Sequence, residues 1–549
     1  MKKLFVVFIG FVAITFAAGQ PIETASTIAI QKHLIQGEPT LLDAECINTG
    51  FSTMPPWLQL DPPWDPNIPI PDVYNRNDQL ISMDVDMNGR IYVAYQTPWT
   101  GTGAGVRYGW GLATSTDQGQ TWDNRVYRVG STNYTELYPE ISITDNGKIY
   151  LYGTLHQVAG GTTYIYQPAF MRSSATCYNN PDSLRGFLVW NLLVYRVYPE
   201  IVTWGNGNEF MFVQYTVDRT GSNDSVCCLF TQDTVTYLYF NFRPPVGNPG
   251  MTSVAVDVSN TDTILTHAIE YYDATGSDWD IVWYLDTLNG SGNFYGWTTG
   301  NVNNDRYPSV YSTMGYSYLA IQSNNGGTDE EILFTNSTDY GATWDAFQDL
   351  SNDGAPDVFP RVHGESSTIG CTWVHDNNQT FYNYSVNNGQ SGTWQGSAEI
   401  VTDAATADTG YHCVALQYMP NYFHAAWEDN RNFATDSIEI ITSRRTTPIG
   451  IKENSSALKT NPLRAFPNPF ANTTTIRFNL GQPSRVDLSI YDASGRIVRN
   501  LIRARAQAGD YAFTWNRKDD QGKAVPNGVY FGRLVTNRGI MTTNLILLK

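Results

Sequence analysis

The chain has 549 residues, of which 13% are aromatic and only 16% are charged, and its formal net charge is −18. It is too long for one domain of ordinary size, and without a sustained 3.6-residue apolar period it does not fit a largely helical protein. The excess of acids also argues against a nucleic-acid-binding protein, because phosphates require a basic surface.

The first residues have the pattern of a secretory signal peptide. Lys2 and Lys3 give the first three residues a positive charge, an apolar run extends from Leu4 to Phe16, and small residues follow up to Gly19. This order predicts a signal peptide over 1–19. The run is shorter than a spanning helix requires, and no later stretch is long enough, so no transmembrane segment is expected. Residues 20–75 have little periodicity and are interpreted as an extended lead-in that lies against the next domain.

Residues 76–445 contain an internal repeat. The segment LYPEISI at 137–143 recurs as VYPEIVT at 197–203, in shorter form from 306 and 358, and less exactly from 80, 251 and 411. A second strand-like run follows each copy. Seven units of about 52 to 60 residues have room for four strands each. The pattern therefore predicts an all-β domain, a seven-bladed β-propeller.

Two octapeptides share one frame, STDQGQTW at 115–122 and STDYGATW at 337–344. In such a frame the Asp accepts hydrogen bonds from its own turn, the Gly takes a positive φ and the Trp returns to apolar packing. A weaker third copy spans 385–394, where either Asn387 or Asn388 replaces the Asp. The residues expected to close these hairpins are Ser115, Asp117, Gly119, Trp122, Ser337, Asp339, Gly341 and Trp344.

The octapeptide resembles the Asp-box, or bacterial neuraminidase repeat, of the sialidase superfamily of β-propellers. That resemblance implies a structural role between the third and fourth strands, away from the ligand face. Sialidase chemistry also needs an arginine triad whose first member lies in a Phe/Tyr-Arg-Ile/Leu-Pro motif. Here Phe359-Pro-Arg361 places the Arg after the Pro, so no catalytic residue is assigned.

The opposite face, where chain enters each first strand and leaves each second strand, is the expected ligand surface. Its acids, arginines and Trp suit a glycan or peptide. The alternative is that these residues are solvated loop ends or braces between blades. An exo-acting glycoside hydrolase of sialidase-like ancestry is the rival to a binding protein. The candidate residues are Glu140, Glu200, Arg306, Arg361, His375, Asp376, Trp427, Asp429 and Arg431.

No cofactor or metal is expected from local motifs. The seven His residues lack zinc-site spacing. The segment Asp84–Gly89 begins like a calcium loop but has Tyr95 where the bidentate Glu belongs, which favours a hairpin turn. Six Cys residues are too sparse for a disulfide scaffold, leaving either a single bridge or buried thiols.

The tail differs sharply in charge from the rest of the chain. Residues 465–549 carry a net charge of +7, which leaves an excess of 25 negative charges on 1–464. Residues 446–464 have the composition of a linker. Strand-like runs after it predict a small Ig-like sandwich.

The tail resembles the type A sorting domain of type IX secretion cargo. The matching segments are FPNPF at 466–470, YDASGRIV at 491–498, GDYAFTW at 509–515, GVYF at 528–531 and LILLK at 545–549. The resemblance implies that outer-membrane type IX secretion machinery recognises residues 466–549. The protein would then pass through the periplasm and be secreted or displayed on the extracellular cell surface. The alternative is an Ig-like adhesion module that stays in place.

Overall fold

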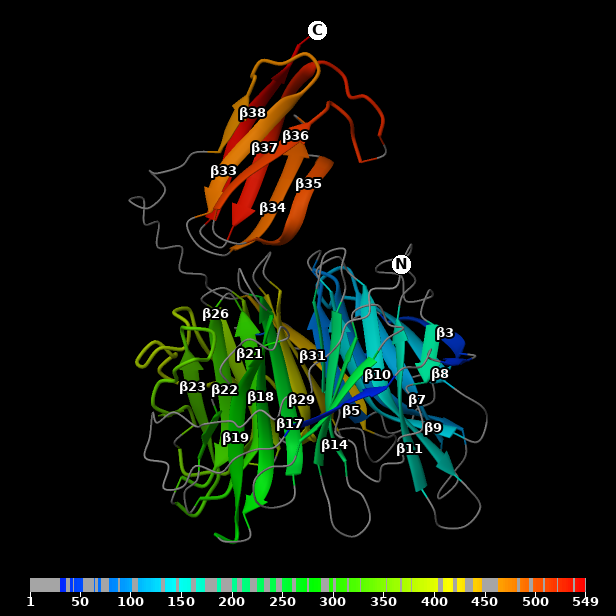
Figure 1. Cartoon of the computed structure of the whole chain (residues 1–549), viewed down its shortest axis with the longest axis vertical. Coiled ribbons are helices and arrows are strands. Elements are labelled where there is room, and N and C mark those ends of the chain that lie inside the picture. Colours follow the sequence, from blue (N-terminus) through cyan, green and yellow to red (C-terminus); the bar gives the residue numbers. More distant parts are fainter. Residues whose placement is uncertain are drawn as a thin grey trace. The chain divides into compact units, whose positions relative to one another are not determined.

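The computed structural model describes residues 30–52, 64–70, 79–129, 134–172, 185–188, 200–242, 249–299, 303–446 and 463–548, without some residues inside these ranges. The regular structure in this part of the chain is all β, and no helix there could cross a membrane. The chain divides into two compact units, Met1–Thr447 and Pro448–Lys549 (Figure 1). The predicted signal peptide lies outside the described residues.

The described part of the first unit contains seven antiparallel sheets, here numbered 1 to 7 in chain order (Figure 1). Sheets 1 to 3 comprise β5 (Gln79–Val85), β6 (Ile91–Thr100), β7 (Arg107–Ser115) and β8 (Trp122–Val129); β9 (Tyr134–Ile143), β10 (Ile149–Val158), β11 (Tyr164–Arg172) and β12 (Arg185–Leu188); and β13 (Glu200–Trp204), β14 (Phe210–Val217), β15 (Ser225–Thr231) and β16 (Tyr237–Phe242). Sheets 4 and 5 comprise β17 (Pro249–Val258), β18 (Thr263–Asp273), β19 (Asp278–Thr287) and β20 (Gly296–Thr298); and β21 (Asp305–Thr313), β22 (Tyr316–Ser323), β23 (Glu331–Ser337) and β24 (Gln348–Asp349). Sheets 6 and 7 comprise β25 (Asp357–Glu365), β26 (Thr368–His375), β27 (Gln379–Ser385) and β28 (Glu399–Ile400); and β29 (Asp408–Gln417), β30 (Tyr422–Asp429) and β31 (Glu439–Thr446).

The sheets have a propeller-like arrangement. The first strand of each sheet contacts the first strand of the next, from β5 through β9, β13, β17, β21 and β25 to β29, and β29 contacts β5. Four strands from the N-terminal side add to outer edges: β1 (Ile30–Ile35) pairs with β16, β2 (Thr40–Leu42) with β12, β3 (Ala44–Ser52) with β8, and β4 (Ile68–Pro69) with β31. Sheet 7 thus obtains its fourth strand from the segment that leads into sheet 1.

Apolar side chains fill the space between neighbouring sheets. Tyr318 and Phe334 of sheet 5 pack in one cluster with Trp373 of sheet 6. Tyr382 of sheet 6 packs in another with Trp427 of sheet 7. Aromatic rings suit this position because one ring covers a large area of both facing sheets.

A β-bulge near the start of several first strands carries a strained residue. Leu80, Tyr138, Tyr307 and Phe359 have φ between 50° and 57° although none is glycine. The register of strand pairing shifts beside each of them. Such a conformation costs about 1 to 3 kcal/mol and persists only where surrounding contacts hold it.

The amide of each bulge residue donates to a side chain on the second strand of the preceding sheet. The acceptors are Gln96 Oε1 for Tyr138 (3.3 Å), Glu270 Oε2 for Tyr307 (2.9 Å), Gln322 Oε1 for Phe359 (3.3 Å) and Glu428 Oε1 for Leu80 (2.6 Å). A serine on some of the first strands adds a second contact, as when Ser253 Oγ accepts from Val310 N and Ser309 Oγ from Val362 N, both at 3.0 Å. The contact between Glu428 and Leu80 joins sheet 7 to sheet 1.

The two octapeptides form matching turns between the third and fourth strands of sheets 1 and 5. In the second, Ser337 Oγ accepts from Gly341 N at 2.8 Å, and Asp339 Oδ1 accepts from Thr343 N at 2.8 Å. In the first, Ser115 and Asp117 make the equivalent contacts to Gly119 and Thr121 at 2.8 and 2.9 Å. Burial alone would raise the pKa of Asp339, but hydrogen bonds from Thr343 and Ser337 lower it below its usual value.

The same turns return their tryptophans to packing. Trp122 is buried, and half-buried Trp344 donates from Nε1 to Gly341 O at 3.0 Å. In sheet 6, Ser385 Oγ accepts from Gly389 N at 3.2 Å, and Asn387 occupies the place of the Asp. The longer spacing to Trp394 is accommodated, since its Nε1 still reaches Gly389 O at 3.2 Å.

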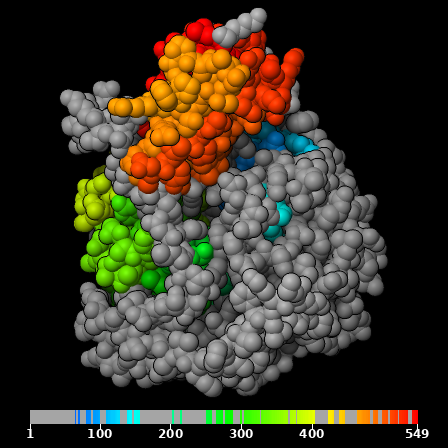
Figure 2. All heavy atoms as spheres, turned by 45° about the horizontal axis from the view of Figure 1, so that its top comes forward, coloured from blue at the N-terminus to red at the C-terminus, as the bar shows by residue number. Residues whose placement is uncertain are grey.

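The C-terminal unit is an Ig-like pair of sheets, and its described surface is coloured orange to red in Figure 2. One sheet contains β32 (Arg464–Phe466), β33 (Thr474–Leu480) and β36 (Gly509–Trp515); the other contains β34 (Ser484–Tyr491), β35 (Ile497–Ala506), β37 (Gly528–Thr536) and β38 (Gly539–Leu547). Alternating apolar residues of both sheets meet in one core around Trp515. Trp515 Nε1 donates to Lys518 O at 3.0 Å, so the buried indole is satisfied.

Replacing Glu428 tests the contact between sheets 7 and 1. Glu428→Ala should lower the free energy of unfolding by about 1 to 3 kcal/mol, because it leaves the Leu80 amide without this acceptor. Glu428→Gln should lose much less, since glutamine oxygens already serve at positions 96 and 322. Urea unfolding of both variants measures the difference. Equal losses in the two variants would show that the acceptor at this position does not matter.

Candidate functional site

Arg306 is placed against Glu270 and two aromatic rings where sheets 4 and 5 meet. Its Nη2 donates to Glu270 Oε1 at 2.9 Å. Its guanidinium carbon lies 4.6 Å from the ring centroid of Trp279 and 4.7 Å from that of Tyr307. The Arg306 side chain keeps 32% of its surface exposed, whereas that of Glu270 is 1% exposed. Arg306 therefore braces the junction and still presents a cation to solvent.

Glu270 connects this cation to the backbone. One carboxylate oxygen accepts from Arg306 and the other from Tyr307 N. Burial raises the pKa of Glu270, while the charge and hydrogen bonds of Arg306 act in the opposite direction. The carboxylate of Glu270 is thus part of the frame that orients Arg306.

Trp279 and Tyr272 form a half-buried aromatic pair on the hairpin of β18 and β19. Their ring centroids lie 5.4 Å apart with the planes at 65°. The amide of Trp279 donates to Asn304 Oδ1 at 3.3 Å, which connects the hairpin to the segment entering β21. A partly exposed indole beside a guanidinium is the kind of surface on which a sugar ring can stack.

Three acids, Asp273, Asp278 and Asp280, occupy the same hairpin, each with an oxygen within 4.8 Å of the others. Burial, followed by the charges of Asp278 and Asp305, raises the pKa of Asp280 to about 6. Burial and the charge of Asp273 also raise the pKa of Asp278. Crowded carboxyl groups beside an aromatic pair are suited to hydrogen-bond the hydroxyls of a ligand.

Glu140 and Arg361 lie on the first strands of sheets 2 and 6. Burial raises the pKa of Glu140 to about 7, and the Ser82 hydroxyl and the Arg361 charge partly oppose that rise. Arg361 Nη1 donates to Pro360 O at 3.1 Å. The charge of Arg361 lowers the pKa of Glu140 although Glu140 lies four sheets earlier in the chain. The first strands of sheets 2 and 6 therefore bring these two candidates into the same region of the first unit.

His375 ends the second strand of sheet 6, and Asp376 follows it directly. His375 Nδ1 lies 2.9 Å from Asp357 Oδ1, and its ring stacks on Phe381 with centroids 4.1 Å apart. Asp376 is exposed, with φ of 50°, and its amide donates to Pro356 O at 2.9 Å. His375 is therefore held in a fixed orientation, while the Asp376 carboxylate faces solvent.

Trp427 and Asp429 belong to the interior, which corrects their assignment to a ligand surface. Both are buried, and Trp427 Nε1 donates to Asp429 Oδ2 at 3.1 Å. The indole packs between sheets 6 and 7, so its face is not available for stacking on a sugar. Glu200 begins β13, but its side chain, like the whole of Arg431, lies outside the described residues.

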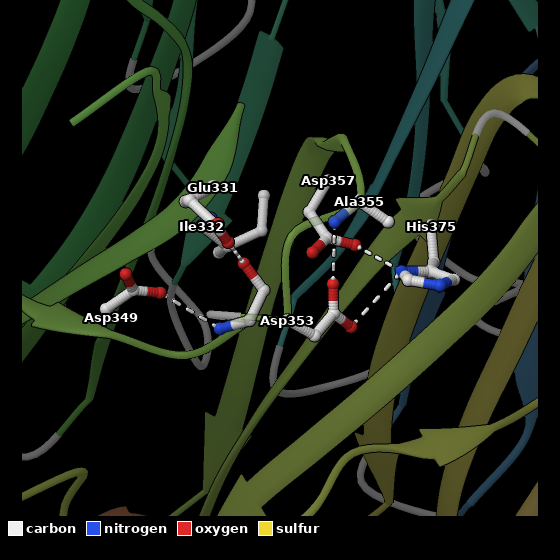
Figure 3. A network of polar contacts seen from close by, with 8 residues as sticks. Glu331, Ile332, Asp349, Asp353, Ala355, Asp357 and His375 are labelled. Carbon is white, nitrogen blue, oxygen red and sulfur yellow. Dashed lines mark hydrogen bonds and ion pairs between the residues drawn. The ribbon is translucent and has the colours of Figure 1, made fainter. Parts of the chain in front are cut away.

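Sequence reasoning missed a polar network around Asp357, which Figure 3 shows. Asp357 and Asp353 both approach His375 Nδ1, at 2.9 and 3.6 Å. Burial raises the pKa of Asp357 to about 7, against the hydrogen bond and charge of His375. A signal did exist, because Asp305 and Asp357 occupy the same place two residues before the bulge residue in adjacent repeats. This signal appears only when the repeats are aligned with each other, and the spacing of residues within a single motif does not show it.

The cysteines add no disulfide where they are described. Cys371 is a free, buried thiol, and burial raises its pKa well above the ordinary value. The side chains of the other five cysteines lie outside the described residues, so the choice between a bridge and thiols stays open for them. The calcium-like segment turns at Gly89, whose amide donates to Asp86 O at 2.9 Å, as expected for a hairpin.

The C-terminal unit is similar in sequence to a flagellar protein. Residues 469–538 match the family model described as the FlgD Ig-like domain. Over 68 residues the chain is 38% identical to the basal-body rod modification protein FlgD of Salmonella typhimurium, and the FlgD of Salmonella typhi gives the same identity. That alignment covers 12% of this chain and only 29% of the relative. The match concerns the Ig-like domain alone.

Solved structures resemble the chain only weakly. A protein of unknown function from Dyadobacter fermentans is 14% identical with a TM-score of 0.41, covering 69% of this chain and 98% of that one. Trypanosoma rangeli sialidase in complex with sialic acid is 9% identical with a TM-score of 0.37, covering 90% and 88%. The α-L-arabinanase of Penicillium chrysogenum is 13% identical with a TM-score of 0.39, covering 61% and 94%. Likeness at this level identifies neither a family nor an activity.

Glu140 should make stability depend on pH. Its folded pKa of about 7 exceeds the usual 4.5, so the folded protein holds this proton more tightly, and stability falls as pH rises between these values. Glu140→Gln removes that loss. Between pH 5 and 8 the variant should gain up to about 3 kcal/mol of unfolding free energy relative to the original protein. If the difference in unfolding free energy between Glu140→Gln and the original protein is the same at pH 5 and pH 8, the raised pKa of Glu140 is wrong.

Proposed function

We propose that the first unit is a seven-bladed β-propeller that binds an extracellular glycan beside Trp279. The observation that carries the proposal is the half-buried indole of Trp279, with the partly exposed Arg306 guanidinium 4.6 Å from its ring centroid. The seven described sheets and their successive first-strand contacts support the blade count.

The chemistry of this surface suits a neutral or cationic sugar more than an acidic one. The aromatic pair provides an apolar platform for the C–H face of a sugar ring. The half-buried carboxylate of Asp273 can accept hydrogen bonds from hydroxyl or amino groups. The three clustered acids outnumber the single cation of Arg306, which disfavours a carboxylated sugar such as sialic acid. The ligand class is therefore a neutral or amino-sugar glycan.

An exo-acting glycoside hydrolase is the second candidate. The raised pKa of Asp280, about 6, is the observation in its favour, because a carboxyl group whose pKa is raised toward the working pH can act as a general acid. Against it, Asp280 is only 2% exposed and hydrogen-bonds to Thr299 Oγ1 at 3.2 Å. A bracing role explains the same contacts, so binding is the better-supported function.

The C-terminal unit is proposed to direct export. Its motifs resemble type A sorting domains, and its charge of +7 contrasts with the acidic remainder of the chain. A compact unit with its own core suits an address that is recognised apart from its cargo. The protein would then cross the periplasm and reach the medium or the cell surface through the type IX machinery. The similarity to the FlgD Ig-like domain equally supports the alternative, an Ig-like module that remains in place.

Glycan binding is tested with Trp279→Ala on a glycan array and by titration of the glycans that bind. The variant should weaken binding about tenfold or more, since stacked aromatic contacts contribute on the order of 1 to 2 kcal/mol. Trp394→Ala is the matched control, because Trp394 is also half-buried but lies in the turn between third and fourth strands. Equal loss in both variants would indicate a general effect on folding.

The same samples are assayed with a panel of aryl glycosides. No turnover is expected. Hydrolysis that disappears in Asp280→Asn, with the fold retained, would replace the binding proposal by the hydrolase.

Export is tested by deleting residues 466–549. The truncated chain should accumulate in the periplasm as a folded propeller, because the proposed address is gone. Cell fractionation with immunoblotting locates it, and limited proteolysis confirms folding. Normal amounts of truncated protein in the medium or on the surface would refute the sorting role and favour the adhesion-module alternative.

A further inference from the structure

A three-residue cluster at the start of sheet 6 has the composition and spacing of a metal site. Asp357 opens β25, His375 ends β26 directly opposite it, and Asp353 lies in the segment leading into β25. One donor atom from each lies within 4.8 Å of the others. Figure 3 shows the three side chains pointing toward one another.

The separations of these atoms fit a small divalent cation. His375 Nδ1 lies 2.9 Å from Asp357 Oδ1 and 3.6 Å from Asp353 Oδ2. Ligands about 2.0 to 2.1 Å from a tetrahedral Zn²⁺ lie roughly 3.3 Å from one another, between these two values. The oxygens of Asp353 and Asp357 lie within 4.8 Å of each other, so the side chains would have to move closer to bind such an ion together.

Neighbouring contacts already orient the donor atoms. The ring of His375 stacks on Phe381 at a centroid distance of 4.1 Å. Asp353 Oδ1 accepts from Ala355 N at 3.1 Å, which leaves Oδ2 directed at His375. Contacts of this kind orient the coordinating side chains at metal sites.

A second observation points to a bound cation. The Asp357 side chain is completely buried, and its Oδ2 has no hydrogen-bond partner among the described residues, because the nearby Ser351 hydroxyl donates to Glu331 Oε2 at 2.7 Å instead. Figure 3 shows the other oxygen of this carboxyl group, Oδ1, joined to His375. A buried carboxylate oxygen without a partner is costly unless a cation or donor meets it. Asp353, 44% exposed, provides a side open to solvent through which an ion can enter.

We propose that Asp353, Asp357 and His375 bind one Zn²⁺ ion through two carboxylates and one imidazole. A mixed nitrogen and oxygen set of three protein ligands leaves a coordination position for water or a ligand group. The site is independent of the surface around Trp279, and its test does not require a glycan.

The experiment uses the full chain, without a histidine tag and after dialysis against a chelator. Zn²⁺ is titrated by isothermal calorimetry, and Co²⁺ is titrated with visible absorption as a probe of tetrahedral geometry. The expected result is saturable binding of one ion with intense Co²⁺ bands. Asp353→Asn should weaken Zn²⁺ binding at least about tenfold and His375→Gln about a hundredfold, because each removes a ligand.

His363→Gln is the matched control, since His363 lies in the same strand pair, opposite Gly370, away from the cluster. It should leave Zn²⁺ affinity unchanged. Asp353 is partly exposed, so its variant should fold even if substitution of buried Asp357 does not. Absence of saturable binding would overturn the proposal and leave a simple hydrogen bond between His375 and Asp357. Binding that survives both ligand variants would overturn it equally by placing the ion elsewhere.

Discussion

A strained backbone amide held by the neighbouring sheet is the contact on which the first unit depends. At four of the junctions the structure describes, a bulge residue with positive φ donates its amide to a Gln or Glu from the preceding sheet. The bulge leaves one backbone amide without a partner in the strand pairing. The Gln or Glu oxygen of the preceding sheet accepts a hydrogen bond from this amide and so stabilises the strained conformation. Neighbouring sheets are therefore joined by directed polar contacts as well as by aromatic packing.

The hydrogen bond between a bulge amide and the preceding sheet also positions the candidate ligand-binding residues. Glu270 receives the Tyr307 amide and the Arg306 guanidinium on its two oxygens, so the contact that joins sheets 4 and 5 also orients the exposed cation. In the next repeat, Asp357 stands two residues before the bulge at Phe359 and faces His375 across the strand pair. Both clusters arise from the geometry of a junction, which explains why bracing and possible ligand binding involve the same side chains.

The octapeptide turns at the third-to-fourth strand connections have a local structural role. Their Ser and Asp oxygens satisfy the amides of a tight turn, and their Trp returns to packing. Nearly all their polar capacity is used within the turn itself, so little remains for a ligand. The repeated polar frame that is easiest to see in the sequence is thus structural, even though Trp122 Nε1 is buried without a partner among the described residues. Buried carboxylate oxygens at other strand ends also lack a partner there. The buried Oδ1 of Asp278 and Oδ2 of Asp357 are examples.

The sequence by itself determined the all-β class, the repeated pair of strands and the hairpin turns, because these depend on local patterns. The Tyr-Pro segments fall in β9 and β21, and the octapeptides close turns with Gly119 and Gly341 at positive φ. Only the tertiary structure decided which side chains meet. Asp353, Asp357 and His375 are brought together by strand register, which no spacing rule encodes. Trp427, a candidate for ligand stacking, is buried because the neighbouring sheet covers it, and alternation along a strand cannot reveal coverage by another sheet.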